Sequence, residues 1–325
     1  MGSAGKSPLT LVLGAGNVGD TSSDPIARYS TPDEVNAFFN VFAKRGYNQI
    51  DTARGYSLHA PGTSEPRIGA IYPGDRFIID SKADPTAGYT KESVLRDIDA
   101  SRDALKVDQI NIYYLHAPDR KNPPELAIEA LDQANKEGKI KAWGISNYRA
   151  DEVQNTLDIC EDRGFVKPSI YQGHYNPVVR GGEKELFPLL RKNNIAFSAY
   201  SPAAAGFFAG SSRTAKPNSR FDSSHTAGSI YVSMYVKPTI EAAVNKALEM
   251  ASKHGIGGHA AALRWTAYHS ILNGAHGDAL VVGASSPEQL ETNIDHIEEG
   301  PLPDDVAAAF EAVGHEAGDE IKYHF

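Results

Sequence analysis

The sequence is poor in cysteine and contains no long hydrophobic stretch. Cys160 is the single cysteine among 325 residues, so an internal disulfide is excluded, as is usual in a reducing compartment. No apolar run approaches the roughly 18 residues that span a bilayer. The first residues, Met1–Pro8, lack the apolar segment of a secretory signal. We therefore expect a cytoplasmic protein with no membrane partner.

Positive charge is scarce as well. The chain has 32 Lys and Arg residues against 41 Asp and Glu residues, a net charge of −9. Such an acidic surface repels polyanions, so nucleic acid is not expected as a partner. No cysteine pair exists, and the carboxyl-terminal histidines lack the spacing of metal ligands, so no metal site is predicted: His254, His259, His269 and His276.

Short apolar segments recur along the chain and are typical of buried parallel strands. The eight candidate strands are Leu9–Leu13, Asn48–Thr52, Phe77–Lys82, Ile110–His116, Lys141–Ser146, Ser169–His174, Ala196–Ser201 and Ala279–Ala284.

Amphipathic segments with helix-capping signals lie between these strands. Thr31 to Glu34 reads Thr-Pro-Asp-Glu, an N-cap with a capping-box glutamate, and Gly46 ends the helix that follows. The same reasoning predicts helices over 91–106, 123–137, 150–163, 183–193, 239–254, 259–270 and 286–300, and a tail follows Pro303.

The alternation of strand and helix predicts an α/β protein, a single (β/α)₈ TIM barrel over residues 1–325 with extra helices. An open doubly wound sheet is the alternative. Residues 203–238, rich in Ala, Gly, Ser and Pro, indicate a long loop after the seventh strand, which we interpret as a lid over cofactor or substrate.

A glycine motif follows the first strand but does not indicate a Rossmann fold. Residues 14–19 read Gly-Ala-Gly-Asn-Val-Gly, yet the next helix cap is Thr31, too distant to present a helix N-terminus to a pyrophosphate. We interpret the motif as a turn close to the mouth of the barrel.

Polar residues stand at the ends of successive strands. Asp51, Lys82 and His116 end the second, third and fourth strands, and Tyr56 follows Asp51 in the next loop. Singly, each would usually be a loop cap, a rim lysine, a buried histidine or a packing aromatic. A barrel gathers its strand ends around one axis, so their joint occurrence favours an active site.

These four side chains suit the reduction of a carbonyl. Hydride addition produces an alkoxide, which needs a proton donor in place as the charge develops. Tyr56 can donate, and a neighbouring ammonium such as Lys82 is expected to lower the tyrosine pKa. Asp51 can offset the burial of the lysine charge, and His116 can orient the carbonyl.

The motifs around these residues resemble those of the aldo-keto reductase superfamily. They include Ile50-Asp51-Thr52-Ala53, Tyr114-Leu115-His116-Ala117-Pro118, Gly144-Ile145-Ser146-Asn147 and Tyr171-Gln172. The carboxyl third, with Ala261 to Trp265 and Ser285 to Asn293, resembles the branch of aflatoxin-aldehyde and succinic-semialdehyde reductases.

The resemblance implies an NADPH-dependent reductase of small-molecule aldehydes, and of ketones in some members. It implies Tyr56 as general acid, Lys82 and Asp51 as the pair that tunes it, and His116 as the group that orients the carbonyl. The cofactor residues it implies are Ser146, Asn147 and Gln172 at the nicotinamide carboxamide, Tyr200 on its ring, Ser201 at the pyrophosphate, and Ser285, Gln289 and Asn293 at the adenosine.

The sequence departs from the family pattern at four places: residues 14–19, 231–237, 283–293 and 322–325. Residues 283–293 hold no lysine or arginine for the 2′-phosphate of NADP, and the candidate replacements are Arg213, Lys216 and Arg220. The last residues, Lys322 to Phe325, lack an arginine for an acidic substrate, which argues against succinic semialdehyde.

Other functions stay open at this point. Some proteins of this fold are regulatory subunits that bind NADPH with little turnover, and residues 203–238 could serve such a subunit as a docking surface. A barrel hydrolase that uses Asp51 and His116 is a further alternative. The resemblance also allows a homodimer.

Overall fold

Eight parallel strands close into a barrel in the part of the chain described by the structure, a computed structural model covering residues 6–212 and 214–325. Each strand pairs with its neighbours in chain order, and β8 returns to β1. The prediction of a (β/α)₈ barrel is confirmed, and the open doubly wound sheet is excluded. The strands are β1 Thr10–Gly14, β2 Gln49–Asp51, β3 Ile78–Lys82, β4 Ile110–Leu115, β5 Ile140–Ser146, β6 Ile170–His174, β7 Ala196–Tyr200 and β8 Ala279–Val282.

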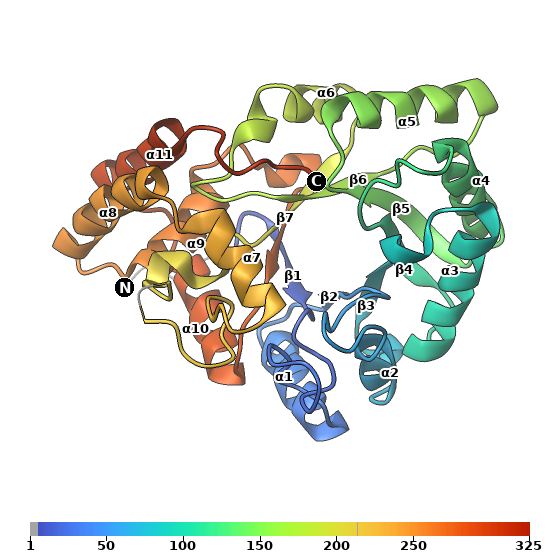
Figure 1. Ribbon diagram of the computed structural model, residues 1–325, viewed down its shortest axis with the longest axis horizontal. Coiled ribbons are helices and arrows are strands. Elements are labelled where there is room, and N and C mark those ends of the chain that lie inside the picture. The colour runs from blue at the N-terminus through green and yellow to red at the C-terminus, as the bar shows by residue number, and fades with distance from the viewer. Residues whose placement is uncertain (1–5, 213) are drawn as a thin grey trace.

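Helices cover the outside of the barrel (Figure 1). The first, α1 (Pro32–Lys44), has the predicted capping box, in which Thr31 and Glu34 bond reciprocally, and it buries Val35, Phe38 and Phe42. The other predicted helices lie close to their expected limits: α3 Lys91–Leu105, α4 Pro124–Lys136, α5 Ala150–Arg163, α6 Leu186–Lys192, α8 Pro238–Lys253, α9 Gly258–Tyr268 and α10 Pro287–Glu298. The tail after Pro303 forms a further helix, α11 Asp304–Ala317.

The helices beyond a minimal barrel pack at one side of it, at the left of Figure 1. There α11 lies against α8, and α9 packs between α8 and α10. Among the described residues, no helix is long and apolar enough to cross a bilayer.

Residues 203–238 are not the uninterrupted loop that the sequence predicted. They contain a 3-10 segment, Ala204–Ala209, and a helix, α7 (Thr226–Tyr235). The helix lacks a strong amphipathic pattern, and its N-cap is His225, whose Nδ1 accepts the backbone N–H of Gly228 at 3.1 Å. Tertiary packing stabilises it, because Tyr235 is fully buried against Phe207 and His174.

A short helix between β2 and β3 also lay outside the sequence predictions. This helix, α2 (Ser64–Gly69), is a six-residue segment with Pro66 inside it. Gly69 allows it to approach α3 closely, because a Cβ there would lie 1.9 Å from the carbonyl oxygen of Ala104.

A buried ion pair joins α6 to the start of β8. The Asp278 carboxylate, fully buried, accepts Nη2 of Arg191 at 2.5 Å and Nη1 at 2.9 Å. It also accepts the backbone N–H groups of Phe197, at the start of β7, and of Asn273, both at 2.8 Å. One carboxylate therefore connects β7, β8 and α6 at the amino-terminal end of the barrel.

We expect Asp278→Ala to lower the free energy of unfolding by about 3–5 kcal/mol, because it leaves a partly buried guanidinium and two backbone donors unpaired. Urea unfolding followed by circular dichroism measures this. The control is Lys184→Ala, which removes a solvent-exposed pair with Asp319 and should leave the stability unchanged. An Asp278→Ala protein as stable as its parent would contradict this account of barrel closure.

Candidate active site

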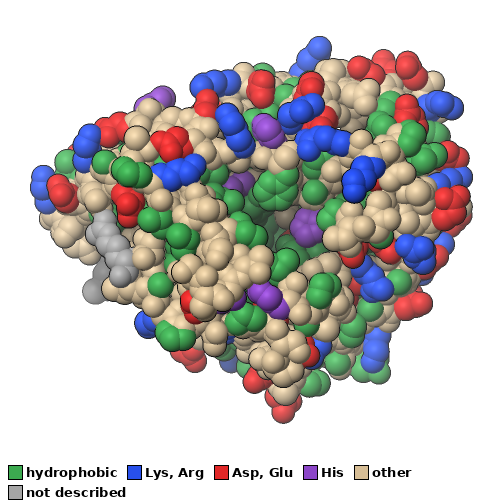
Figure 2. Space-filling view, viewed as in Figure 1, with side chains coloured by type: hydrophobic (Ala, Val, Ile, Leu, Met, Phe, Trp, Pro, Cys, Tyr) green, Lys and Arg blue, Asp and Glu red, His purple; other side chains and the backbone are tan. Residues whose placement is uncertain are grey.

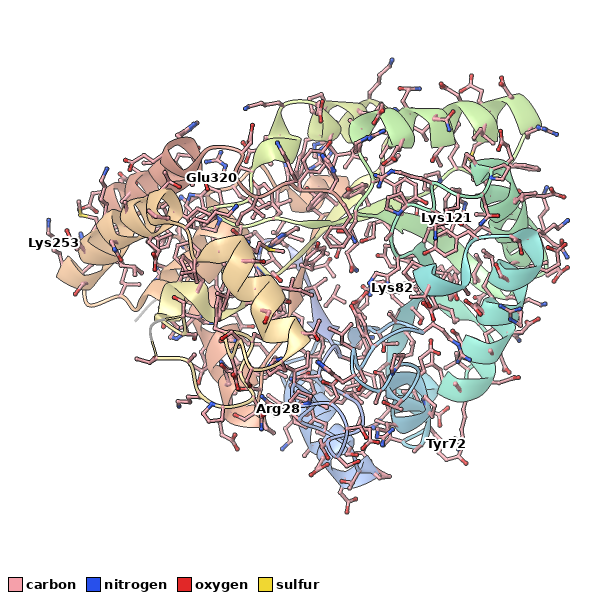
Figure 3. The ribbon with its side chains drawn as sticks, in the orientation of Figure 1. Arg28, Tyr72, Lys82, Lys121, Lys253 and Glu320 are labelled. Atoms are coloured by element: carbon pink, nitrogen blue, oxygen red, sulfur yellow. The ribbon has the colours of Figure 1, made fainter. Side chains whose placement is uncertain are left out.

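Lys82 lies at the centre of the barrel and contacts three groups through its ammonium (Figure 3). Its Nζ lies 2.6 Å from Oδ2 of Asp51, 2.8 Å from the carbonyl oxygen of Thr52 and 3.1 Å from the hydroxyl of Tyr56. Lys82 is fully buried, and Asp51 is 1% exposed. Burial alone would lower the lysine pKa, but the Asp51 charge and these hydrogen bonds raise it above its usual value.

Tyr56 lies in the turn after β2, with its ring against the lysine. Its hydroxyl lies 3.5 Å from Oδ2 of Asp51, and Nζ of Lys82 lies 4.8 Å from its ring centroid. Burial raises the pKa of Tyr56 above its usual value, and the lysine charge offsets only part of that increase. The net direction is opposite to the sequence-based expectation, because removing water penalises the phenolate more than one paired ammonium stabilises it. Tyr56 therefore holds its proton throughout the neutral range.

His116 follows β4 and presents its ring edge to Tyr56, with the ring centroids 5.7 Å apart. Its backbone is held on both sides, because its N–H donates to the hydroxyl of Tyr89 and its carbonyl accepts Nδ2 of Asn147. Burial and the Lys82 charge lower the pKa of His116 to about 3, so the imidazole is neutral. Its Nδ1 is buried and has no hydrogen-bond partner.

The structure thus brings Asp51, Tyr56, Lys82 and His116 together from three neighbouring strands. The turn of residues 14–19 forms part of the wall, because a Cβ on Gly16 would lie 3.8 Å from the Tyr56 ring. This turn leads into no helix before Pro32, so the Rossmann reading of the glycine motif is rejected by the structure as well.

The residues expected at the nicotinamide border the same site. Gln172 is buried, and its Nε2 donates to Oδ1 of Asp51 at 2.8 Å. Ser146 accepts Nδ2 of Asn147 at 3.0 Å, and Asn147 has a positive φ of 67°. Oδ1 of Asn147 accepts the hydroxyl of Tyr200 at 2.8 Å, so the Asn147 amide is already bonded within the protein.

Tyr200 is held by residues that the sequence analysis did not select. Its ring stacks on His174, with centroids 5.1 Å apart. Nε2 of His174 lies 2.6 Å from the hydroxyl of Tyr235, and Nδ2 of Asn176 donates to that hydroxyl and to the carbonyl of Ser201. His174 ends a predicted strand, so its position was an available signal, but its partner in α7 is 61 residues away.

The residues expected at the adenosine lie at the start of α10. Ser285 and Gln289 are exposed, and Oε1 of Gln289 accepts both the backbone N–H and the hydroxyl of Ser285 at 2.7 Å. Asn293 is 3% exposed and bonded internally, to the carbonyl of Gly283 and to Nε2 of His259. The structure places Ser285 and Gln289 at the surface and Asn293 beneath them.

Figure 2 shows a hollow over the barrel axis, lined by hydrophobic side chains and histidine, with charged side chains mainly around its rim. The described residues contain no cluster of three His, Cys, Asp or Glu side chains that could hold a metal ion. The hollow therefore offers hydrogen-bond donors and aromatic surfaces to a ligand.

Comparison with known proteins identifies the family. The model of the aldo/keto reductase family matches residues 10–315. The chain is 36% identical over 308 residues to oxidoreductase sirO of Leptosphaeria maculans, covering 93% of each chain. It is 35% identical over 328 residues to human aldo-keto reductase family 7 member A3, covering 97% of this chain and 96% of that protein.

A third relative, human aflatoxin B1 aldehyde reductase member 2, is 36% identical over 306 residues, which cover 89% of this chain and 84% of that protein. These relatives and the family model span the barrel and all four central side chains. The chain is an oxidoreductase that belongs to the aldo/keto reductase family.

Proposed function

We propose that this protein reduces small-molecule aldehydes to alcohols with NADPH, and that Tyr56 donates the proton. The observation that carries the proposal is the Lys82 ammonium, which is held by Asp51 and lies 3.1 Å from the Tyr56 hydroxyl. NADPH supplies the hydride when it is bound.

Tyr56 and Lys82 provide the proton and the charge that the reduction needs. As the carbonyl oxygen gains negative charge, the Tyr56 O–H can transfer its proton to it, which leaves a phenolate beside the ammonium. Electrostatic attraction within a buried site stabilises that phenolate more than the same contact would in water. Since burial raises the Tyr56 pKa, the Tyr56 hydroxyl is protonated before each turnover.

His116 supplies a second, neutral hydrogen-bond donor. A neutral imidazole carries one N–H, and the His116 ring lies edge-on to Tyr56. A carbonyl oxygen between the two rings would accept from both, so its position and polarisation would be set together. A protonated His116 would compete with Tyr56 as the acid, but its pKa of about 3 prevents this.

The cofactor would extend from the barrel axis to the start of α10. The Ser146 hydroxyl, Asn147 and Gln172 would face the nicotinamide carboxamide. One face of the Tyr200 ring lies on His174, and its other face would stack on the nicotinamide ring. Ser201 would adjoin the pyrophosphate. Ser285 and Gln289 are exposed where an adenosine could contact them, and Asn293 would hold the Gly283 turn in position.

Arg28 and Arg220 are the cations best placed for a 2′-phosphate. The Arg28 guanidinium donates to the carbonyl oxygens of Pro25 and Ala27 and to that of Asn218 in the segment after β7. Burial and the nearby Arg220 lower the Arg28 pKa, and the Asp24 charge offsets only part of this decrease. Arg220 is one of the three sequence candidates, whereas Arg213 lies outside the described residues and Lys216 is exposed.

These two arginines lie on the adenosine side of the mouth. The hydroxyl of the adjacent Tyr29 lies 3.5 Å from the carbonyl of Ala284, just before α10. In Figure 3, Arg28, which belongs to the loop between β1 and α1, lies next to the segment after β7. A phosphate between two guanidinium groups would relieve their repulsion, which supports NADPH over NADH.

We expect Tyr56→Phe to lower the rate of NADPH oxidation with 4-nitrobenzaldehyde by about 10²–10⁴-fold, the effect of losing a general acid, with NADPH affinity retained. Tyr72→Phe is the control, since Tyr72 is 62% exposed far from the site (Figure 3). Undiminished turnover of Tyr56→Phe would refute the assigned role.

The same assay on the parent protein distinguishes the alternative functions. Tight NADPH binding with no turnover in the parent would favour a regulatory subunit, and turnover without NADPH would favour a hydrolase.

We expect Arg28→Ala combined with Arg220→Ala to weaken NADPH binding by about 10–100-fold while NADH binding stays unchanged, because only NADPH carries the 2′-phosphate. Quenching of intrinsic fluorescence measures both dissociation constants without turnover. Lys253→Ala, in the last turn of α8, is the control cation and should change neither value. Equal losses for the two cofactors would exclude these arginines as the phosphate ligands.

A further inference from the structure

A second buried carboxyl group lies beside the catalytic ion pair and has no place in the mechanism above. Asp80 precedes Lys82 by two residues on β3, so the two side chains share the interior face of the barrel. The strand register pairs Asp80 directly with Asp51 on β2. Asp80 is 1% exposed, so two buried carboxyl groups, those of Asp51 and Asp80, face each other across β2 and β3 beside Lys82.

The hydrogen-bond partners of Asp80 are all neutral. Oδ2 accepts Nε2 of Gln49 at 2.6 Å, and Oδ1 accepts Nδ2 of Asn111 at 2.7 Å and the backbone N–H of Ile112 at 3.1 Å. Asp51, by contrast, bonds the Lys82 ammonium directly. Burial outweighs the donors, and together with the Asp51 charge it raises the pKa of Asp80 to about 7.

A cavity lies close to Asp80 on the side away from the substrate. It has a volume of about 410 Å³, opens at the amino-terminal end of the barrel, and is lined by Asn111 and Ile79 and by the charged side chains of Asp75, Lys106, Asp108 and Lys141. Asn111 is a hydrogen-bond partner of Asp80, so the carboxyl group lies one hydrogen bond from a residue that lines this cavity.

We propose that Asp80 is a positioning residue that acts through Lys82: its negative charge strengthens the hold of Tyr56 on its proton and thereby extends aldehyde reduction to higher pH. The inference rests on the proposed function of Tyr56. The charged and titratable groups that face Asp80 are Asp51 on β2, Lys82 on β3 and Tyr114 on β4.

The sign follows from the charges of this group of side chains. With Asp80 ionised, a second carboxylate lies on the same face of the barrel as Lys82 and partly offsets the field of its ammonium, so a Tyr56 phenolate is stabilised less. Tyr56 then keeps its proton to higher pH, where it can still act as a proton donor. Alcohol oxidation needs the phenolate as a base, so the same charge moves the acid limb of the reverse reaction to higher pH.

The test is Asp80→Asn, which removes the charge and keeps a side chain of the same shape. We expect the alkaline limb of the pH profile for aldehyde reduction to move down by about one pH unit, and the acid limb for alcohol oxidation to move with it. Oxidation near pH 7.5 should become several-fold faster. A pH titration of tyrosinate absorbance, with Tyr56→Phe as the blank, should show the same shift without turnover.

Glu65→Gln is the matched control. Glu65 is an equally buried carboxyl group that accepts the Ser81 hydroxyl of the same strand at 2.6 Å, on the face away from Lys82. Its removal should leave the pH profile in place. An unmoved profile in Asp80→Asn, or an equal shift in Glu65→Gln, would overturn the proposal.

The parent enzyme provides a test that needs no variant. Below the Tyr56 pKa the logarithm of the oxidation rate should rise with pH at a slope of about one, and ionisation of Asp80 should reduce this slope between about pH 6 and 8. A constant slope through that range overturns the proposal even if Asp80→Asn does not fold. An inactive parent would instead contradict the proposed function itself.

Discussion

The ammonium of Lys82 and the carboxylate of Asp51 lie 2.6 Å apart in a volume from which water is excluded, and the other features of the site depend on this pair. Removing two charges from water is costly unless their geometry is good and their remaining hydrogen-bond capacity is satisfied. Here Gln172 donates to the second oxygen of Asp51, and Thr52 and Tyr56 complete the contacts of the ammonium. The barrel makes this possible, because β2 and β3 are neighbours and their register places Asp51 opposite Asp80, two residues before Lys82.

Several titratable groups of the site favour their neutral forms more strongly than they would in water. Burial raises the pKa of Tyr56 and Asp80 and lowers that of His116 and His174. A site with one compensated ion pair and neutral neighbours suits a reaction in which charge appears only at the transition state, because fixed dipoles then act without reorganisation. The same burial gives Asp80 a pKa of about 7, so it is the neighbour whose charge can change near neutral pH.

The segment after β7 contacts both the active site and the loop between β1 and α1. Asn218 accepts the Arg28 guanidinium, and Tyr235 of α7 bonds His174, on which Tyr200 stacks. A displacement of this segment would therefore disturb the Tyr200 ring and the two arginines together. The lid function expected of residues 203–238 stays a prediction, and the segment holds a helix.

Local sequence signals were sufficient to predict the eight strands, most of the helices and the polar residues at the strand ends, because hydrophobic periodicity and capping residues are local. The sequence also sufficed to select Asp51, Tyr56, Lys82 and His116, since strand ends meet in a barrel. Tertiary structure alone decided the fold of α7, the role of His174 in holding Tyr200, the direction of the Tyr56 pKa and the pairing of Asp80 with Asp51. These features arise from burial and from contacts between residues distant in the chain, which no local pattern encodes.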